Sequence, residues 1–222
     1  RILSKSELRM EIIKINLVYL PKFGQVNKWF NMGQKKFPQI KENYSFYNNL
    51  LSERKSIFTE VIEINKTGNN HNTLESVEEV THPNATEDKM VLLVDVKVNN
   101  HDFFQFKLRY KSFVPAPFFR FDSDGETHRN KVDGVELKDQ AITTPHFHKF
   151  NENGIEIAYK TDKLLDPKES KALEDINFCI VHFFYESNTR LKDDDFPQIK
   201  IESNTLGFKM TKEDPNQNIT FL

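Results

Sequence analysis

Hydrophobic and polar residues alternate in the middle of the chain with the two-residue period of β-strands. From residue 101 to 110 the apolar positions of one face are Phe104, Phe106, Leu108 and Tyr110. The pattern predicts a strand there, and shorter apolar runs predict further strands at 57–64, 90–98, 118–121 and 199–201. Short turns such as Asn99-Asn100 join neighbouring strands, which indicates antiparallel pairing.

Two stretches break this pattern with polar residues, and helical spacing occurs towards both ends of the chain. Residues 66–89 contain Gly68 and Pro83 and predict a long mobile loop, and residues 122–144 predict a polar connection. The apolar spacing of residues 4–20 predicts a helix, and residues 168–186, which follow Asp166-Pro167, predict another.

We therefore expect an α+β protein with a mainly antiparallel sheet, an N-terminal helical segment and a C-terminal helix packed on the sheet. We expect one domain over residues 1–222. Within it, residues 1–55 form a helical and basic-aromatic segment, and residues 56–222 form the sheet and its helix.

A predicted hairpin carries the most reactive residues of the chain. Residues 145–150 read as one strand, Asn153-Gly154 as the turn and residues 155–159 as the second strand. Because side chains at i and i+2 of a strand point to the same face, His146 and His148 should project together.

Composition narrows the function classes. The chain has 222 residues, a formal net charge of -2, 29% charged residues and a single cysteine, Cys179, in an apolar run. These values favour a cytoplasmic protein without a disulfide framework, and no apolar run approaches the ~18 residues of a membrane span. Glycine-rich phosphate loops and nucleophile elbows are absent from the sequence, which disfavours an ATPase, a Rossmann dehydrogenase and an α/β-hydrolase.

Three histidines are the first candidate site. His146 and His148, with His128 from the preceding connection, supply three nitrogens for a divalent metal, zinc or magnesium, and Glu152 or Asp122 supplies a carboxylate ligand or a general base. In a metal-free alternative, His128, His146 and His148 act as acid and base, and Arg129 is the charge clamp on a phosphodiester. A third interpretation gives the paired histidines a purely structural role.

The spacing His146-x-His148-x-x-x-Glu152 is similar to the first metal motif of cupin barrels. The chain lacks the glycine spacing that follows in that family, and His182 would have to serve as the final ligand from a predicted helix.

Asp95 and Lys97 are the second candidate. They share one face of an apolar strand, which is similar to the Asp/Glu-x-Lys strand of the restriction-type nuclease fold. That fold also needs an upstream acid, and the sequence offers Glu60, Glu63 or Asp88. The simpler interpretation is an outward-facing charged edge of a half-buried strand.

Residues 22–41 combine lysines with aromatic rings and have no acidic residue. Such a mixture can hold a phosphate backbone and stack bases, which makes Lys28, Trp29, Lys35 and Lys36 candidate binding residues. The alternative is a solvated basic face over rings that pack into the core.

One passage resembles a known family. Arg120-Phe121-Asp122, His128-Arg129-Asn130, Pro145-His146-Phe147-His148 and Ala158-Tyr159 look like an uncharacterised bacterial family that pairs a His-Arg-Asn turn with a downstream Pro-His-x-His strand. The resemblance covers residues 120–159 and implies a bacterial or mobile-element origin, but no activity.

Two functions remain open from the sequence. The first is an accessory or interaction protein that contacts protein or nucleic acid. The second is a histidine- or metal-dependent hydrolase or nuclease that acts on phosphodiesters.

Overall fold

The computed structural model describes residues 36–68, 72–132, 134–192 and 195–203. The helix expected at residues 4–20 and most of the basic-aromatic segment, including Lys28, Trp29 and Lys35, lie outside these ranges. Among the described helices, none is long and apolar enough to cross a membrane.

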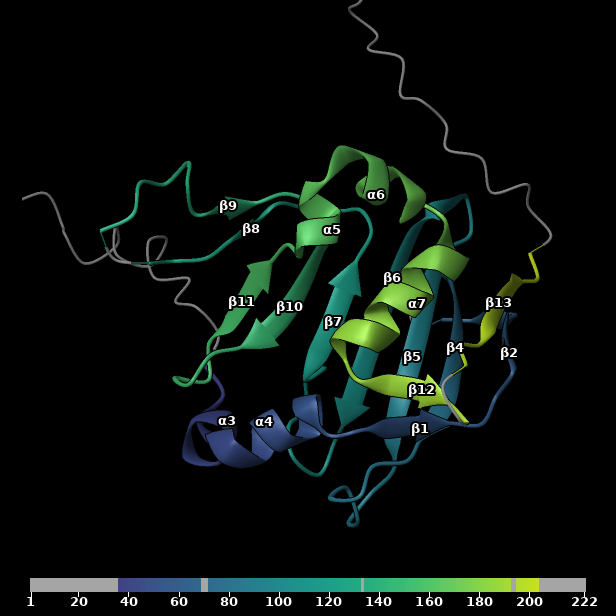
Figure 1. Ribbon diagram of the computed structural model, residues 1–222, viewed down its shortest axis with the longest axis horizontal. Helices are drawn as coiled ribbons and strands as arrows, with labels where there is room; N and C mark the ends of the chain where they lie inside the picture. Colours follow the sequence, from purple (N-terminus) through teal and green to yellow (C-terminus); the bar gives the residue numbers. More distant parts are fainter. Residues whose placement is uncertain (1–35, 69–71, 133, 193–194, 204–222) are drawn as a thin grey trace, which may run out of the picture. The chain divides into compact units, whose positions relative to one another are not determined.

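A seven-stranded antiparallel sheet dominates the described chain (Figure 1). Its strands follow the spatial order β11-β10-β7-β6-β5-β4-β3. In chain order they are β3 (Lys66–Thr67), β4 (Thr73–Val80), β5 (Met90–Lys97), β6 (Asn100–Tyr110), β7 (Phe119–Asp122), β10 (His146–Phe150) and β11 (Glu156–Tyr159). The α+β class and the antiparallel sheet expected from the sequence are confirmed.

Short strands and helices surround this sheet. Parallel pairs join β1 (Lys55–Ile57) to β12 (Thr189–Leu191) and β2 (Val61–Ile64) to β13 (Gln198–Ile201). The helices are α3 (Pro38–Glu42), α4 (Tyr44–Ser52), α5 (Asp162–Leu165), α6 (Pro167–Ala172) and α7 (Ile176–Glu186). Between β7 and β10 the chain makes a two-stranded arm from β8 (His128–Arg129) and β9 (Ala141–Ile142).

The core lies between α7 and one face of the sheet (Figure 1). The alternation of β6 buries Phe104, Phe106 and Leu108 completely, while Gln105 and Lys107 between them stay half-buried. Rings from four elements stack there: Phe106, Phe119, Phe147 and Phe183 have neighbouring centroids 5.3–6.4 Å apart. This aromatic core accounts for much of the unusual phenylalanine content of the chain.

Helices α3 and α4 also belong to this core, through Ile40, Tyr47 and Leu50. The Tyr47 hydroxyl donates to the carbonyl of Phe118 at 3.2 Å and accepts from the amide of Phe150 at 2.8 Å. It thereby fills the gap where β7 and β10 separate.

The prediction of a long loop at residues 66–89 is wrong. The middle of this stretch forms β4, which pairs with all eight residues of β5. The sequence of β4 is too polar to be recognised as a strand, because one face of β4 lies on the open side of the sheet and carries glutamates that contact water. Residues 81–89 form the connection between β4 and β5.

The single helix expected at residues 168–186 is two helices. The carboxylate of Asp166 accepts from the amides of Lys168 and Glu169 and caps α6, with Pro167 in its first turn. The carboxylate of Asp175 then accepts from the amides of Asn177 and Phe178 and starts α7. A second capping aspartate restarts the helix in a new direction.

Candidate functional site

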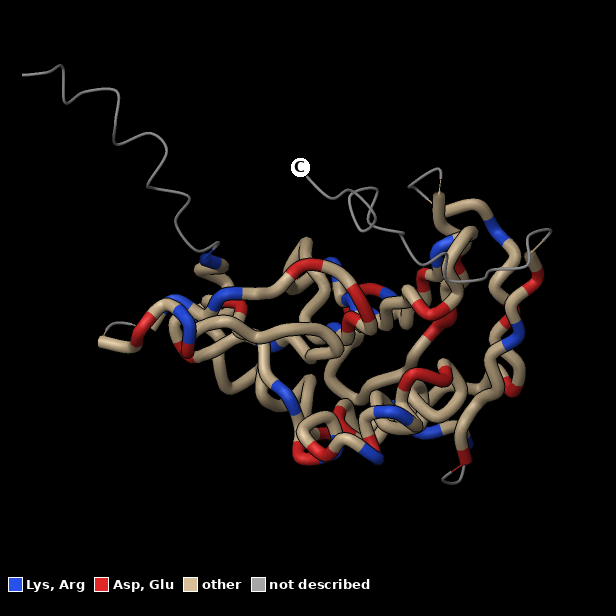
Figure 2. The backbone as a smooth tube through the Cα atoms, turned by 90° about the horizontal axis from the view of Figure 1, so that it is seen from above, with Lys and Arg blue, Asp and Glu red and all other residues tan. Residues whose placement is uncertain are grey.

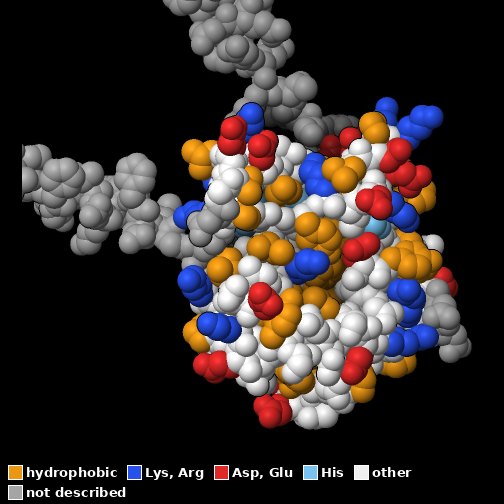
Figure 3. Space-filling view, turned by 60° about the vertical axis from the view of Figure 1, so that its left-hand side comes forward, with side chains coloured by type: hydrophobic (Ala, Val, Ile, Leu, Met, Phe, Trp, Pro, Cys, Tyr) orange, Lys and Arg blue, Asp and Glu red, His pale blue; other side chains and the backbone are white. Residues whose placement is uncertain are grey.

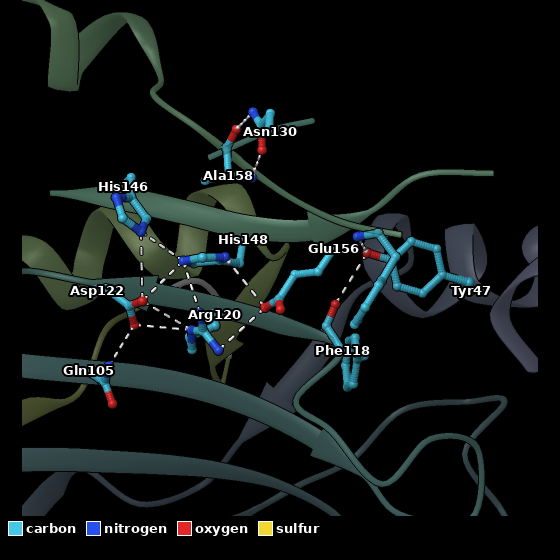
Figure 4. A network of polar contacts seen from close by, with 11 residues as sticks. Tyr47, Gln105, Phe118, Arg120, Asp122, Asn130, His146, His148, Glu156 and Ala158 are labelled. Carbon is cyan, nitrogen blue, oxygen red and sulfur yellow. Dashed lines mark hydrogen bonds and ion pairs between the residues drawn. The ribbon is translucent and has the colours of Figure 1, made fainter. Parts of the chain in front are cut away.

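The two histidines of β10 do project to one face, as the two-residue spacing predicts. In the antiparallel register His146 lies opposite Asp122 and His148 lies opposite Arg120 on β7. All four side chains therefore occupy the sheet face opposite α7, which we call the polar face (Figure 4). The predicted hairpin turn is confirmed, with Gly154 at a φ of 69°.

Three donor atoms converge at the centre of this cluster. The two histidine Nε2 atoms lie 2.7 Å apart, and Asp122 Oδ2 lies 3.0 Å from His148 Nε2 and 3.7 Å from His146 Nε2. In a tetrahedral zinc site with bonds of ~2.0–2.1 Å, ligand atoms are ~3.3 Å apart. The cluster therefore already has nearly the spacing of a metal-ligand set.

Hydrogen bonding alone leaves the His148 Nε2 atom in conflict. This nitrogen faces a carboxylate acceptor, Asp122, and a guanidinium donor, Arg120 Nη2, both at 3.0 Å. A protonated nitrogen suits only the carboxylate, and an unprotonated nitrogen suits only the guanidinium. A metal ion among the three donor atoms would satisfy the two histidines and the carboxylate together.

Burial makes that conflict costly. His146 is 1%, His148 3% and Asp122 8% exposed. Figure 3 shows histidine as only small pale-blue patches on one side of the molecule, among charged and hydrophobic side chains. A buried polar group with an unsuitable partner lowers stability, because water cannot replace the missing hydrogen bond.

Arg120 and Glu156 surround the cluster with further charge. The Arg120 Nε atom lies 3.1 Å from both oxygens of Asp122, and its Nη1 atom lies 3.3 Å from Glu156 Oε1. Glu156 Oε1 is also 3.4 Å from His148 Nδ1. Gln105 Nε2 donates to Asp122 Oδ1 at 2.9 Å. Asp122 is thus held by Gln105 and Arg120, which fixes the direction of the oxygen that faces the histidines.

Burial favours neutral rings at His146 and His128, and the pKa of Asp122 favours an ionised carboxylate beside them. Desolvation by burial and the neighbouring His148 lower the pKa of His146 to about 4. The same two causes, in the same order, lower the pKa of His128. Burial alone would raise the pKa of Asp122, but the hydrogen bond to His148 and the charge of Arg120 outweigh it and lower that pKa. Metal ligands need these protonation states at neutral pH.

The β8–β9 arm brings the third histidine to the cluster. The side-chain amide of Asn130 donates to the carbonyl of Ala158 at 2.7 Å and accepts from its amide at 2.8 Å, which ties the arm to β11 (Figure 4). The ring of His128 then lies 4.9 Å from the ring of His148. Its Nε2 atom is buried without a hydrogen-bond partner in the part of the chain that the structure describes.

An open hollow of about 290 Å³ gives access to the cluster, which we call the histidine hollow. Its lining includes Gln105, Arg120, Asp122, Gly125, His128 and His148. His146 is buried and does not line it. A ligand in the hollow would therefore meet His148, Arg120 and His128 first.

Other residues expected at the site lie elsewhere. Glu152 is exposed in the hairpin turn, four residues beyond His148, and Arg129 is exposed on β8. His182 lies on α7 at the opposite face of the sheet, where its ring packs 5.3 Å from that of Phe147. Lys36 is exposed and bridges to Ile155.

Arg120, Glu156 and Gln105 are contacts that the sequence did not identify. Arg120 takes the place expected for Arg129 as the cation beside the histidines. Arg120 and Asp122 are separated by one residue, as His146 and His148 are. This shared spacing indicates that each pair projects to one face of its strand. The strand register that sets the two pairs side by side comes only from the fold.

The Asp95 and Lys97 pair lies farther along the polar face. Asp95 forms an ion pair with Lys107, and Lys97 places its ammonium 3.8 Å above the ring of Phe103. Of the expected upstream acids, Glu60 instead pairs with Lys192. Neither Glu63 nor Asp88 lines the hollow at Asp95 and Lys97, where the second acid is Glu75.

The fold and the cluster define an α+β protein with a buried His/Asp group whose donor atoms are placed to hold a metal ion. Comparisons with protein-family models, curated proteins and solved structures find no match for the chain. The resemblance of residues 120–159 to a bacterial family stays a prediction.

Proposed function

We propose that the protein is a zinc-dependent hydrolase of phosphate esters, with the ion held by Asp122, His146 and His148. The observation that carries this proposal is the convergence of three donor atoms at a buried point where hydrogen bonding alone leaves a conflict. One side of the cluster opens into the histidine hollow.

The donor set favours zinc over magnesium. Two imidazole nitrogens and one carboxylate form a common ligand set of catalytic zinc, whereas magnesium prefers oxygen ligands. Three protein ligands also leave a position for water or substrate. A bound zinc ion supplies a Lewis acid and a coordinated water of lowered pKa.

The chain itself would orient the substrate. Arg120 presents a planar guanidinium beside the cluster, held by Asp122 and Glu156. Its contacts with Asp122, Glu156 and His148 use three of its five N–H groups, and the other two would bind phosphoryl oxygens, which makes Arg120 the anion clamp. His128 lines the entrance, and its buried Nε2 atom, which has no hydrogen-bond partner among the described residues, would hydrogen-bond the water or the leaving group there.

Zinc titration of purified, metal-stripped protein tests the proposal, with binding followed by calorimetry and bound metal by elemental mass spectrometry. We expect one equivalent of zinc in the wild-type protein, and a loss of affinity of roughly 100-fold or more in His148→Ala and Asp122→Asn. The matched control His101→Ala, a half-buried histidine on the same sheet, should keep the wild-type affinity.

Measurements of turnover distinguish the proposed zinc ligands from His128, which would act on the substrate without binding the metal. Zinc-loaded protein should hydrolyse bis(p-nitrophenyl) phosphate, and His128→Ala should keep the metal but lose most of the rate. Wild-type protein that takes up no stoichiometric zinc would overturn the proposal and favour the interaction-protein hypothesis. Stoichiometric zinc without hydrolysis of any phosphate ester would overturn the enzymatic part alone.

A further inference from the structure

A second hollow adjoins the histidine hollow on the polar face. It measures about 210 Å³, lies over β4, β5 and β6, and has Glu75, Asp95, Lys97, Phe103, Lys107 and Arg109 in its lining. We call it the arginine hollow. Phe103 and Gln105 line both hollows, so the two meet at one border across β6.

Strand register shows how the two hollows are aligned. One row runs across five strands as Glu75, Asp95, Gln105, Asp122 and His146, and the next row contains Leu93, Lys107, Arg120 and His148. Adjacent strands are ~4.8 Å apart, so Lys107 on β6 and His148 on β10 are separated by roughly 10 Å. A ligand spanning that length would lie across the strands.

The arginine hollow has positive charge available for a ligand. Asp95 already pairs with Lys107, but the Nε atom of Arg109 is buried without a hydrogen-bond partner among the described residues. The Lys97 ammonium lies over the ring of Phe103 at the border between the hollows. These three cations outnumber the two acids, Glu75 and Asp95, that also line the hollow.

Of the two hollows, only the arginine hollow has more cations than acids, because the histidine hollow sets Arg120 beside Asp122, Asp124 and Glu126. Figure 2 shows basic and acidic residues interspersed along the backbone, and the net charge is -2. Anion recognition must therefore come from individual contacts, because the molecule as a whole does not attract polyanions. Each hollow on the polar face has one arginine in its lining, Arg120 in the first and Arg109 in the second.

We propose that the two hollows form one groove for a chain of at least two phosphodiesters, such as a short single-stranded oligonucleotide. One phosphodiester would lie at Arg120 beside the histidines, and the next at Arg109. The assignment of the reacting end rests on the proposed function, whereas the second anion site rests on the arginine hollow alone.

A length series tests the groove. The ligands are thymidine oligonucleotides of two, three and four residues, with nuclease-resistant phosphorothioate links, and fluorescence anisotropy gives the dissociation constants with and without zinc. Affinity should rise by roughly tenfold when the ligand gains its second phosphodiester, because a second charged contact forms. The salt slope should steepen by ~0.7 at the same step.

Arg109→Gln should remove that step while leaving the dinucleotide affinity and the zinc affinity unchanged. Lys111→Gln is the matched control, because Lys111 is an exposed lysine just beyond β6 that lines neither hollow, and it should keep the step.

Affinities that do not change with length, or a step that survives in Arg109→Gln, would overturn the groove. Zinc binding with no length step would reject the groove and leave the proposed function standing. A length step in a protein that binds no zinc would support the groove and reject the proposed function.

Discussion

The two faces of the seven-stranded sheet use the same strands for opposite purposes. The face towards α7 packs aromatic rings, and along β6 it buries Phe104 and Phe106 completely. On the polar face the alternate residues Gln105 and Lys107 hydrogen-bond or pair with carboxylates of neighbouring strands. Consecutive residues of β6 therefore point to opposite faces, one of which packs the core while the other carries the candidate site.

The difference shows how the site is positioned. The ring contacts between β7, β10 and α7 fix the strands relative to one another, and that register places Asp122 opposite His146. Close-packed rings tolerate little displacement, so the aromatic face holds the donor atoms of the other face at their spacing. The predictions below test this separation.

The largest effect should come from the aromatic face. Phe183→Ala removes a completely buried ring that packs against Phe106 and Phe119, and should lower the free energy of unfolding by about 3–5 kcal/mol. Gln105→Ala, from the polar face, should cost less than about 1.5 kcal/mol. Urea unfolding followed by circular dichroism measures both.

Equal losses in Phe183→Ala and Gln105→Ala would show that the faces do not divide these tasks. If Phe183→Ala proves too unstable to purify, Phe183→Leu keeps most of the volume. Its folded form should bind zinc with the wild-type affinity.

A polar residue on the aromatic face should make stability depend on pH. Burial, with a contribution from Lys163, lowers the pKa of His182 to about 4, so the folded protein prefers the neutral ring. The unfolded chain binds a proton near pH 6.5, so this contribution is complete above that pH and is lost as the pH falls to about 4. The loss should be on the order of 2–3 kcal/mol.

Urea midpoints at pH 7.5 and pH 4.5 measure that dependence, with His182→Asn as the comparison. The variant should lose less stability than the wild type between the two values, because its side chain does not titrate. A variant with the full wild-type dependence would place the titrating group elsewhere, for example at His146, whose pKa is lowered to a similar value.

The smallest effect should come from the link between the arm and the sheet. Asn130→Ala removes two hydrogen bonds to the backbone of the buried Ala158 and should cost about 1–2 kcal/mol. Hydrogen exchange at the Ala158 amide should accelerate, while zinc affinity through His146 and His148 should persist. Asn153→Ala, in the exposed hairpin turn, is the control and should change neither.

The sequence predicted β5, β6, β7, the hairpin of β10 and β11, and the shared direction of His146 and His148, because all depend on local period and turn chemistry. It missed β4, because a strand with one solvated face can be nearly as polar as a loop. It also missed the second helix start at Asp175, although that residue is a recognisable N-cap.

The partners of the histidines were harder to predict. Glu152 was expected because it lies close in sequence, but the hairpin turn carries it away from the cluster. Arg120 and Glu156 reach the histidines only because β7, β10 and β11 pair in one particular register. Contacts of this kind depend on tertiary structure, and one sequence alone does not specify them.

The arm also affects how this molecule meets other copies of itself. A sheet with open edges can pair with strands of a second molecule and aggregate. Here β3 at one edge has only two residues, and at the other edge Lys36 bridges to Ile155 while Asn130 occupies the backbone groups of Ala158. The residue that positions the third histidine thus also blocks edge-to-edge growth of the sheet at β11.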